Sequence, residues 1–182
     1  MLPLDDPRWE SLNSGAAKAL RRLETALKEA NISDEDLKDL YWWFCNQGTV
    51  YRRSYAAVPH LVRLSRLAGL EARLELLKLV AAIERGRRRD AEEPLPADLQ
   101  PAYVQALAEA RSSLAVCVAE QTWDFKRALK TAGIFLALNG FTEAGFEVSK
   151  MDDWMECPKC GALLLEPQKD EQSLQTIAET KG

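Results

Sequence analysis

The chain has 182 residues, of which 47% are hydrophobic and 29% charged, and this composition indicates a folded domain rather than a disordered chain. The formal net charge of −4 argues against a duplex nucleic acid as partner, because such partners favour a basic surface. We expect a cytoplasmic protein without a secretory signal or membrane span, because the sequence has no basic-then-apolar leader, no run of ~18 apolar residues and no disulfide-like cysteine spacing.

Apolar residues at helical spacing predict two helices near the start of the chain. The first covers residues 16–30 and follows a break at residues 13–15. Ser33 or Asp34 is the expected cap of the second, whose apolar stripe extends to Phe44. A short connection between the two predicts that they pack antiparallel.

A third helix is predicted over residues 51–67. Gly48 suits the left-handed conformation that follows the end of a helix, and Thr49 is the expected cap of the next one. Pro59 lies inside the third helical pattern, where it removes one backbone hydrogen bond and is expected to bend the helix. A proline inside such a helix is typical of HEAT-like units.

Three further helices are predicted in the second half of the chain. The fourth has its apolar pattern over residues 70–83, and the fifth begins near Pro101 and continues to residue 118. The sixth covers residues 125–136 and ends near residues 139–140.

About six helices with short connections predict an all-α fold of HEAT-like stacked antiparallel helix pairs. Residues 55–59 and 103–107 open similar apolar faces about 48 positions apart, near the ~40–47 residues of HEAT and armadillo units. The alternative is an irregular helical bundle with one kink. We assign residues 1–150 to the helical domain, 151–166 to a knuckle-like appendage, and 167–182 to a tail that is disordered or a loose helix.

Several segments carry a resemblance to a known family. They are the motif CNQGTVY at residues 45–51, the motif SYAAVPHLV at 54–62, DDPRW at 5–9, and CPKCG at 157–161. Together they resemble a family of bacterial HEAT-like proteins of unknown function. Some similar proteins are encoded near toxin genes, so the resemblance implies an immunity or adaptor role. The family has no established catalytic residues that could be carried over.

The pair Cys157 and Cys160, followed by Gly161, is the candidate metal site. Two thiolates at this spacing are typical of a zinc knuckle, but a structural zinc needs four ligands and no second pair follows. Two chains can pair their knuckles, a distant side chain can complete the site, or the knuckle binds no metal. The remaining histidine and thiols of the chain are His60, Cys45 and Cys117.

An aromatic and polar cluster between residues 42 and 55 is the candidate binding site. Trp42 and Trp43 fall partly outside the apolar stripe of the second helix, so we expect at least one at the surface. Aromatic and arginine side chains together are typical of interface anchors, although core packing and helix capping are alternative roles. The predicted binding residues are Trp42, Trp43, Asn46, Gln47, Tyr51, Arg52 and Tyr55.

No complete catalytic site is recognisable. His60 has no nucleophile paired with it in the pattern, so a structural or surface histidine is expected. The basic run at residues 85–89 is followed at once by acidic residues, which is typical of a solvated loop.

The sequence therefore predicts a non-enzymatic protein-binding module, with another protein as partner and a homodimer as one option. A toxin-immunity or adaptor role is the version that the resemblance implies. The alternative is a zinc-dependent nucleic-acid-binding or regulatory module that uses the knuckle.

Overall fold

The computed structural model describes residues 1–89, 94–119, 125–150, 155–156 and 163–164. In this part of the chain the helices are α1 (Arg8–Lys28), α2 (Asp34–Phe44), η1 (Asn46–Gly48), α3 (Arg52–Ser65), α4 (Leu70–Arg89), α5 (Gln100–Ala119), α6 (Phe125–Leu138) and α7 (Thr142–Lys150). Two short strands, β1 (Met155–Glu156) and β2 (Leu163–Leu164), pair antiparallel. Among the described helices, none has the length together with the hydropathy needed to span a bilayer.

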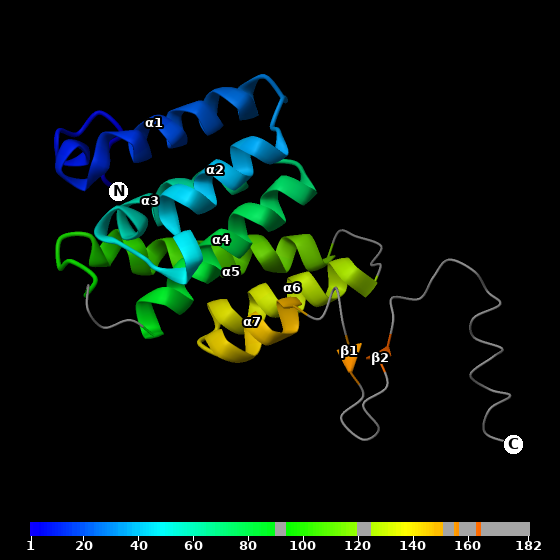
Figure 1. The fold of residues 1–182 in the computed structure, drawn as a ribbon. Coiled ribbons are helices and arrows are strands. Elements are labelled where there is room, and N and C mark those ends of the chain that lie inside the picture. The colour runs from blue at the N-terminus through cyan, green and yellow to red at the C-terminus, as the bar shows by residue number, and fades with distance from the viewer. Residues whose placement is uncertain (90–93, 120–124, 151–154, 157–162, 165–182) are drawn as a thin grey trace, which may run out of the picture.

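The helices form stacked pairs in two layers (Figure 1). Helices α1, α3 and α5 pack side by side in one layer, and α2, α4 and α6 form the other. The two helices of each pair, α1 with α2, α3 with α4 and α5 with α6, run antiparallel (Figure 1). The predicted all-helical fold of stacked antiparallel pairs is therefore confirmed.

Helix α7 was not predicted from the sequence, and it packs on α6 and α4. It is only nine residues long, so its apolar pattern is short. Gly145 permits the close approach to α6, because a Cβ at this position would overlap the carbonyl oxygen of Gly133 and the backbone nitrogen of Ala137.

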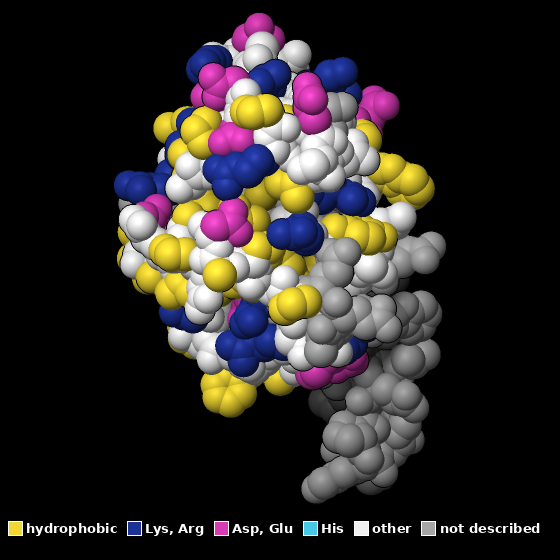
Figure 2. Space-filling model, turned by 90° about the vertical axis from the view of Figure 1, so that its left-hand side faces the viewer, with side chains coloured by type: hydrophobic (Ala, Val, Ile, Leu, Met, Phe, Trp, Pro, Cys, Tyr) yellow, Lys and Arg dark blue, Asp and Glu magenta, His cyan; other side chains and the backbone are white. Residues whose placement is uncertain are grey.

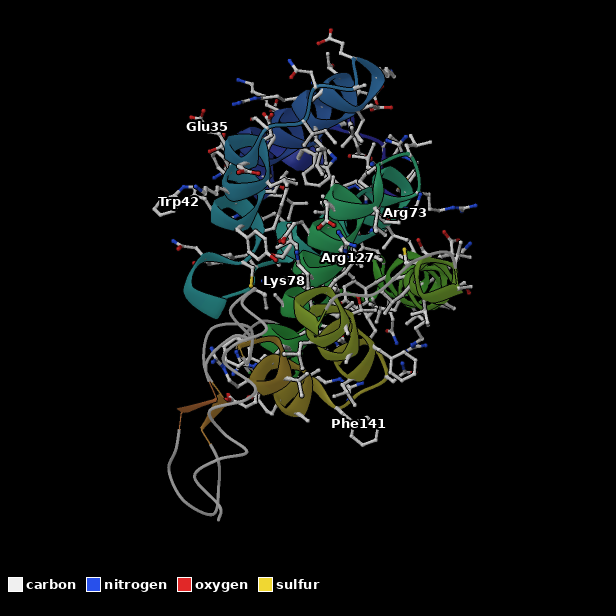
Figure 3. All side chains as sticks on the ribbon, turned by 90° about the vertical axis from the view of Figure 1, so that its right-hand side faces the viewer. Glu35, Trp42, Arg73, Lys78, Arg127 and Phe141 are labelled. Carbon is white, nitrogen blue, oxygen red and sulfur yellow. The ribbon has the colours of Figure 1, made fainter. Side chains whose placement is uncertain are left out.

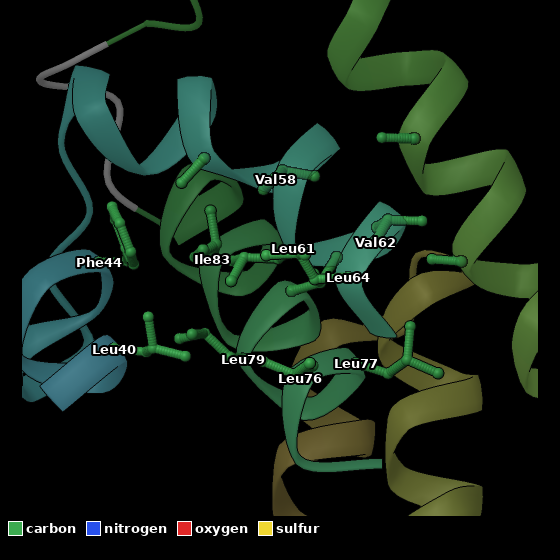
Figure 4. Packing of buried hydrophobic residues seen from close by; sticks show 14 of the residues in the cluster. Leu40, Phe44, Val58, Leu61, Val62, Leu64, Leu76, Leu77, Leu79 and Ile83 are labelled. Atoms are coloured by element: carbon green, nitrogen blue, oxygen red, sulfur yellow. The ribbon is translucent and has the colours of Figure 1, made fainter. Parts of the chain in front are cut away.

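The core lies between the two layers, and α3 is at its centre (Figure 4). Its residues 54–58 are all buried, as are the apolar side chains one turn further along. The fully buried leucines include Leu61 and Leu64 from α3 and Leu77 from α4, which belong to one hydrophobic cluster (Figure 4). Burial of each such side chain stabilises the fold by about 1.5–3 kcal/mol compared with leaving the same side chain in solvent.

Local signals near the N-terminus act largely as predicted. The expected break is a kink inside α1 at Asn13, which has a φ of 103°, although the helix already begins at Arg8. The Asn13 side chain accepts a hydrogen bond from the Gly15 backbone N–H at 3.0 Å. Ser33 caps α2 through a reciprocal pair of hydrogen bonds with Asp36.

The connection from α2 to α3 differs from the prediction in one respect. Gly48 has a φ of +80°, as expected, and ends the short helix η1. Thr49, however, is extended and does not cap α3. Tyr51 is the residue that precedes α3, and its backbone N–H donates to the Ser54 hydroxyl at 3.0 Å. Val50, in the same extended stretch, is buried against Gly86 of α4.

Candidate functional site

The outer surface of α2 carries an exposed tryptophan. The Trp42 side chain is 65% exposed and extends away from the helix into solvent (Figure 3). Glu35 and Lys38 are also exposed and lie on the same face at helical spacing, whereas Leu40 and Phe44 are buried on the opposite face. The prediction that at least one tryptophan lies at the surface is confirmed.

Trp43 is half-buried and joins α2 to its neighbours. Its ring lies so close to Gly15 of α1 that a Cβ on that glycine would overlap it. The Trp43 carbonyl oxygen accepts a hydrogen bond from Nε of Arg53 in α3 at 2.9 Å. Beside it, Arg22 of α1 pairs with Asp36 at 2.8 Å. Trp43 and these contacts hold α2 in place between α1 and α3.

The turn that follows α2 contributes the other predicted binding residues. Asn46 and Tyr51 are half-buried, and Arg52 is exposed. The Arg53 guanidinium lies over the Tyr51 ring at 4.0 Å from its centroid, which fixes that ring. The side chain of Gln47 lies outside the described residues. We call the set Glu35, Lys38, Trp42 and Asn46 the Trp42 surface.

Tyr55 was predicted to belong to the binding site, and this prediction is wrong. Its side chain is 0% exposed and packs edge-on against Tyr103 of α5, with ring centroids 5.8 Å apart. The reason is helix phase: Tyr55 lies on the side of α3 that faces α5, and is part of the core.

The basic residues 85–89 form the C-terminal end of α4, where cations favour the negative end of the helix dipole, so they are not part of a solvated loop. Glu84 is 1% exposed and accepts hydrogen bonds from Arg87 and Arg88 at 2.7–2.8 Å. It also accepts one from the Tyr103 hydroxyl at 2.9 Å. Burial raises the pKa of the Glu84 carboxyl, but these hydrogen bonds outweigh it and hold the pKa below its ordinary value. The spacing of three and four residues was a usable signal for this network.

A cleft of about 450 Å³ opens between α2, η1, α4 and α7. It is lined by Tyr41, Cys45, Gly48, Ala82, Arg85, Gly86, Arg89 and Phe146. Arg85 donates two hydrogen bonds to the Glu143 carboxylate at 2.8–2.9 Å and lies 3.5 Å above the Phe146 ring. Within the described part of the chain, no carboxylate pairs with Arg89. Nothing in the sequence pattern brought these side chains together.

Tyr41 and Cys45, which both line this cleft, carry buried polar groups. The Tyr41 hydroxyl is buried and has no hydrogen-bond partner among the described residues. Burial raises the pKa of Tyr41 well above its ordinary value, and burial also raises the pKa of the Cys45 thiol. Both groups are therefore neutral near pH 7, and the Cys45 thiol is a poor nucleophile.

His60 is buried among structural contacts. Its Nε2 lies 2.7 Å from the Leu2 carbonyl oxygen, which accepts the hydrogen bond of the ring N–H, and its ring contacts Trp9. Burial lowers the pKa of His60 and favours the neutral ring. These contacts fit the expected structural histidine, which ties the N-terminal segment to α3.

The predicted zinc ligands Cys157 and Cys160 lie outside the described residues. Within those residues, no group of three or more histidine, cysteine, aspartate or glutamate side chains is placed to hold a metal ion. Cys45 and Cys117 are both free and buried, as expected for small apolar side chains. Zinc binding therefore stays a prediction.

Charges of both signs are mixed on the surface. Figure 2 shows lysine and arginine interspersed with aspartate and glutamate on the face that lies to the left in Figure 1. The described residues of this face form no continuous basic stripe, which is the usual feature of a surface that binds a nucleic-acid backbone.

The chain matches no family model, no curated protein and no solved structure. The resemblance to bacterial HEAT-like proteins, based on residues 45–62 and the other motifs, therefore stays a prediction.

Proposed function

We propose that this protein is a non-enzymatic protein-binding module whose partner binds at the Trp42 surface. The observation that carries this proposal is a tryptophan 65% exposed on a helix whose other side is buried in the core. Tryptophan buries about 150–250 Å² on contact and is among the residues most enriched at the centres of protein interfaces.

The surroundings of Trp42 support binding rather than chance exposure. Glu35 and Lys38 provide charges of both signs along the same helix face, as in the polar rim of an interface. The Ser33 cap and the packing of Trp43 fix α2 before any partner arrives. A preformed surface lowers the entropic cost of binding, because little of it has to be ordered.

The kind of partner is a further part of the proposal. The resemblance of residues 45–62 to bacterial HEAT-like proteins favours a toxin that this chain neutralises in the cytoplasm, or another protein that it adapts. A second copy of the chain is the alternative partner. Both versions use the Trp42 surface, and they differ in the mass of the complex.

Co-purification from the native host tests the proposal. The chain offers a matched pair of variants, because Phe141 is 63% exposed and lies in the turn between α6 and α7, away from α2 (Figure 3). We expect the wild type and Phe141→Ala to recover the same protein in stoichiometric amount, and Trp42→Ala to lose it. Recovery of no protein by the wild type, or equal recovery by Trp42→Ala, contradicts the proposal.

A further inference from the structure

The two ends of the helix stack have different surfaces. The pair α1 with α2 lies at one end, and the pair α5 with α6, partly covered by α7, lies at the other (Figure 1). Beyond the kink at Asn13, the described exposed side chains of α1 are all polar, namely Lys18, Arg21, Arg22, Thr25 and Lys28. A polar outer face of this kind keeps the terminal unit of a helical stack soluble.

The outer surface of α5 lacks this polar character. Only two of its twenty residues are charged. Val104 is 57% exposed and Val118 is 49% exposed, and the exposed Ala108 and Ala115 lie between them in the sequence. A helix that is apolar on all sides is normally buried, so the exposed side of α5 indicates a surface that a partner covers.

Helix α6 extends this apolar surface. Among the side chains described in this helix, the exposed ones are Ala128, Ala132 and Phe135, and all three are apolar. Their spacings of four and three residues place them on one face of the helix. Helix α7 packs against Gly133 and Ala137 on another side of α6 and leaves this face exposed.

Arg111 lies at the edge of the apolar surface and joins the two helices. Its Nε donates a hydrogen bond to the Leu138 carbonyl oxygen at 2.8 Å, which places the cation at the negative end of α6. The other charged residue of α5, Glu109, pairs with Arg66 of the neighbouring helix turn. We call the following six exposed apolar residues the end face: Val104, Ala108, Ala115, Val118, Ala132 and Phe135.

The order of residues along α5 favours a second copy of the chain as the occupant of the end face. Val104 and Val118 are fourteen residues apart, and between them Ala108 and Ala115 are seven residues apart. Multiples of seven keep side chains in line along a pair of packed helices. The order valine, alanine, alanine, valine is the same in both directions. A twofold interface needs such a surface, because the same patch meets itself.

The size and charge of the end face also fit this pairing. Helix α5 is about 30 Å long at 1.5 Å per residue, and two adjacent helices are about 20 Å wide. The face therefore covers about 600 Å² per copy, or about 1,200 Å² in the pair, at the lower limit for a specific interface. A strongly charged partner finds only Arg111 beside this face, whereas a second copy is equally apolar.

We propose that two copies of the chain pair through the end face, with their α5 helices antiparallel. Val104 then packs against Val118 of the partner subunit, and Ala108 packs against Ala115 of the partner subunit. The pairing is independent of the Trp42 surface, because α2 contacts neither α5 nor α6 within the described part of the chain. It places two Trp42 surfaces on one assembly, which strengthens binding to a target that carries two copies of its own site.

Sedimentation velocity of the full chain tests this pairing. We expect the wild type to shift from its monomer mass of 20.4 kDa to twice that mass between about 1 and 500 µM. Ala108→Glu should weaken the pairing about 30-fold or more, because it buries a charge against an alanine. This variant should still fold, since the position is exposed on a helix and glutamate is a good helix former.

A charge swap tests the antiparallel arrangement. The double variant Ala108→Glu with Ala115→Lys places each new carboxylate opposite a new ammonium group of the partner subunit. It should therefore pair at least about tenfold more tightly than Ala108→Glu alone. In a parallel arrangement like charges would meet instead, and the pairing would stay lost.

Two further variants separate the end face from other surfaces. Ser11→Glu introduces the same charge on α1, at the opposite end of the stack, and should pair as the wild type does. Trp42→Ala shows whether the copies pair through the Trp42 surface instead, and it should also leave the pairing unchanged. A wild type that stays monomeric across this range, a double variant no tighter than Ala108→Glu, or loss of pairing in Ser11→Glu or Trp42→Ala overturns the proposal.

Discussion

Trp42 and Tyr55 belong to the same aromatic segment of the sequence, yet the fold gives them opposite environments. Trp42 is 65% exposed on α2, and Tyr55 is 0% exposed on α3. Their chemistry is similar, so the difference comes from helix phase and from the layer in which each helix packs. Helix α3 is covered by α1, α4 and α5, whereas α2 is at the edge of its layer.

This difference separates a stabilising aromatic residue from a binding one. Removal of Tyr55 should change the stability of the whole fold, and removal of Trp42 should change only what the surface binds. A comparable difference occurs within α4, where Arg87 and Arg88 pair with the buried Glu84, whereas Arg89 lines the cleft beside α2 and α7. The predictions below test whether residues that stabilise the fold differ in this way from residues that bind a partner.

The largest expected effect is on stability, in Tyr55→Ala. Loss of a fully buried aromatic ring, with its edge-on contact to Tyr103, should lower the free energy of unfolding by about 3–5 kcal/mol. Urea-induced unfolding followed by circular dichroism measures it. A loss below about 1 kcal/mol would place Tyr55 outside the core and remove the contrast with Trp42.

A smaller loss is expected for Glu84→Gln. The variant keeps the shape of the side chain but leaves two arginines without their counter-charge, which should cost about 2 kcal/mol. The loss is below that of a fully enclosed ion pair because both guanidinium groups reach solvent. Glu143→Gln, which removes an exposed carboxylate, is the control and should cost less than about 1 kcal/mol.

The direction in which this loss of stability changes with pH follows from the pKa of Glu84. The pKa of Glu84 is lower in the folded chain than its ordinary value of 4.5, so the ionised group stabilises the fold above pH 4.5. That contribution disappears as the pH falls through the folded pKa. The difference between wild type and Glu84→Gln should therefore shrink in acid, and a difference that grows there would contradict the network.

His60 should give the smallest effect on stability, visible only as a pH dependence. Its folded pKa lies below the ordinary value of 6.5, so below about pH 6.5 the unfolded chain takes up a proton that the folded chain does not. Stability should fall as the pH decreases from 7.5 to 5.5. It is the sole histidine of the chain, so His60→Gln should flatten this slope, and an unchanged slope would place the titration elsewhere.

Much of the fold could be predicted because local signals and helix patterns agree. Ser33, Gly48 and the apolar stripes placed the early helices, and Gly140 marks the end of α6 with a φ of +99°. Helix α7 was missed because it is short and depends on the close packing of Gly145 against α6. Tertiary contact, rather than local sequence, determines that element.

The candidate site could be predicted only in part. The exposure of Trp42 follows from its position outside the stripe, but the burial of Tyr55 depends on α5, almost fifty residues away in sequence. The cleft is formed by α2, α4 and α7 together, so no single segment encodes the meeting of Tyr41, Arg89 and Phe146. Contacts between side chains of different helices cannot be predicted from the apolar periodicity along a single helix.

The most direct test of the central claim is the affinity of Trp42→Ala for the protein that co-purifies with the wild type, measured beside its free energy of unfolding. We predict that the affinity falls about 30-fold or more, as for an interface hot spot, while the free energy of unfolding changes by less than about 0.5 kcal/mol. An unchanged affinity would contradict the assignment of Trp42 as the anchor of the binding surface.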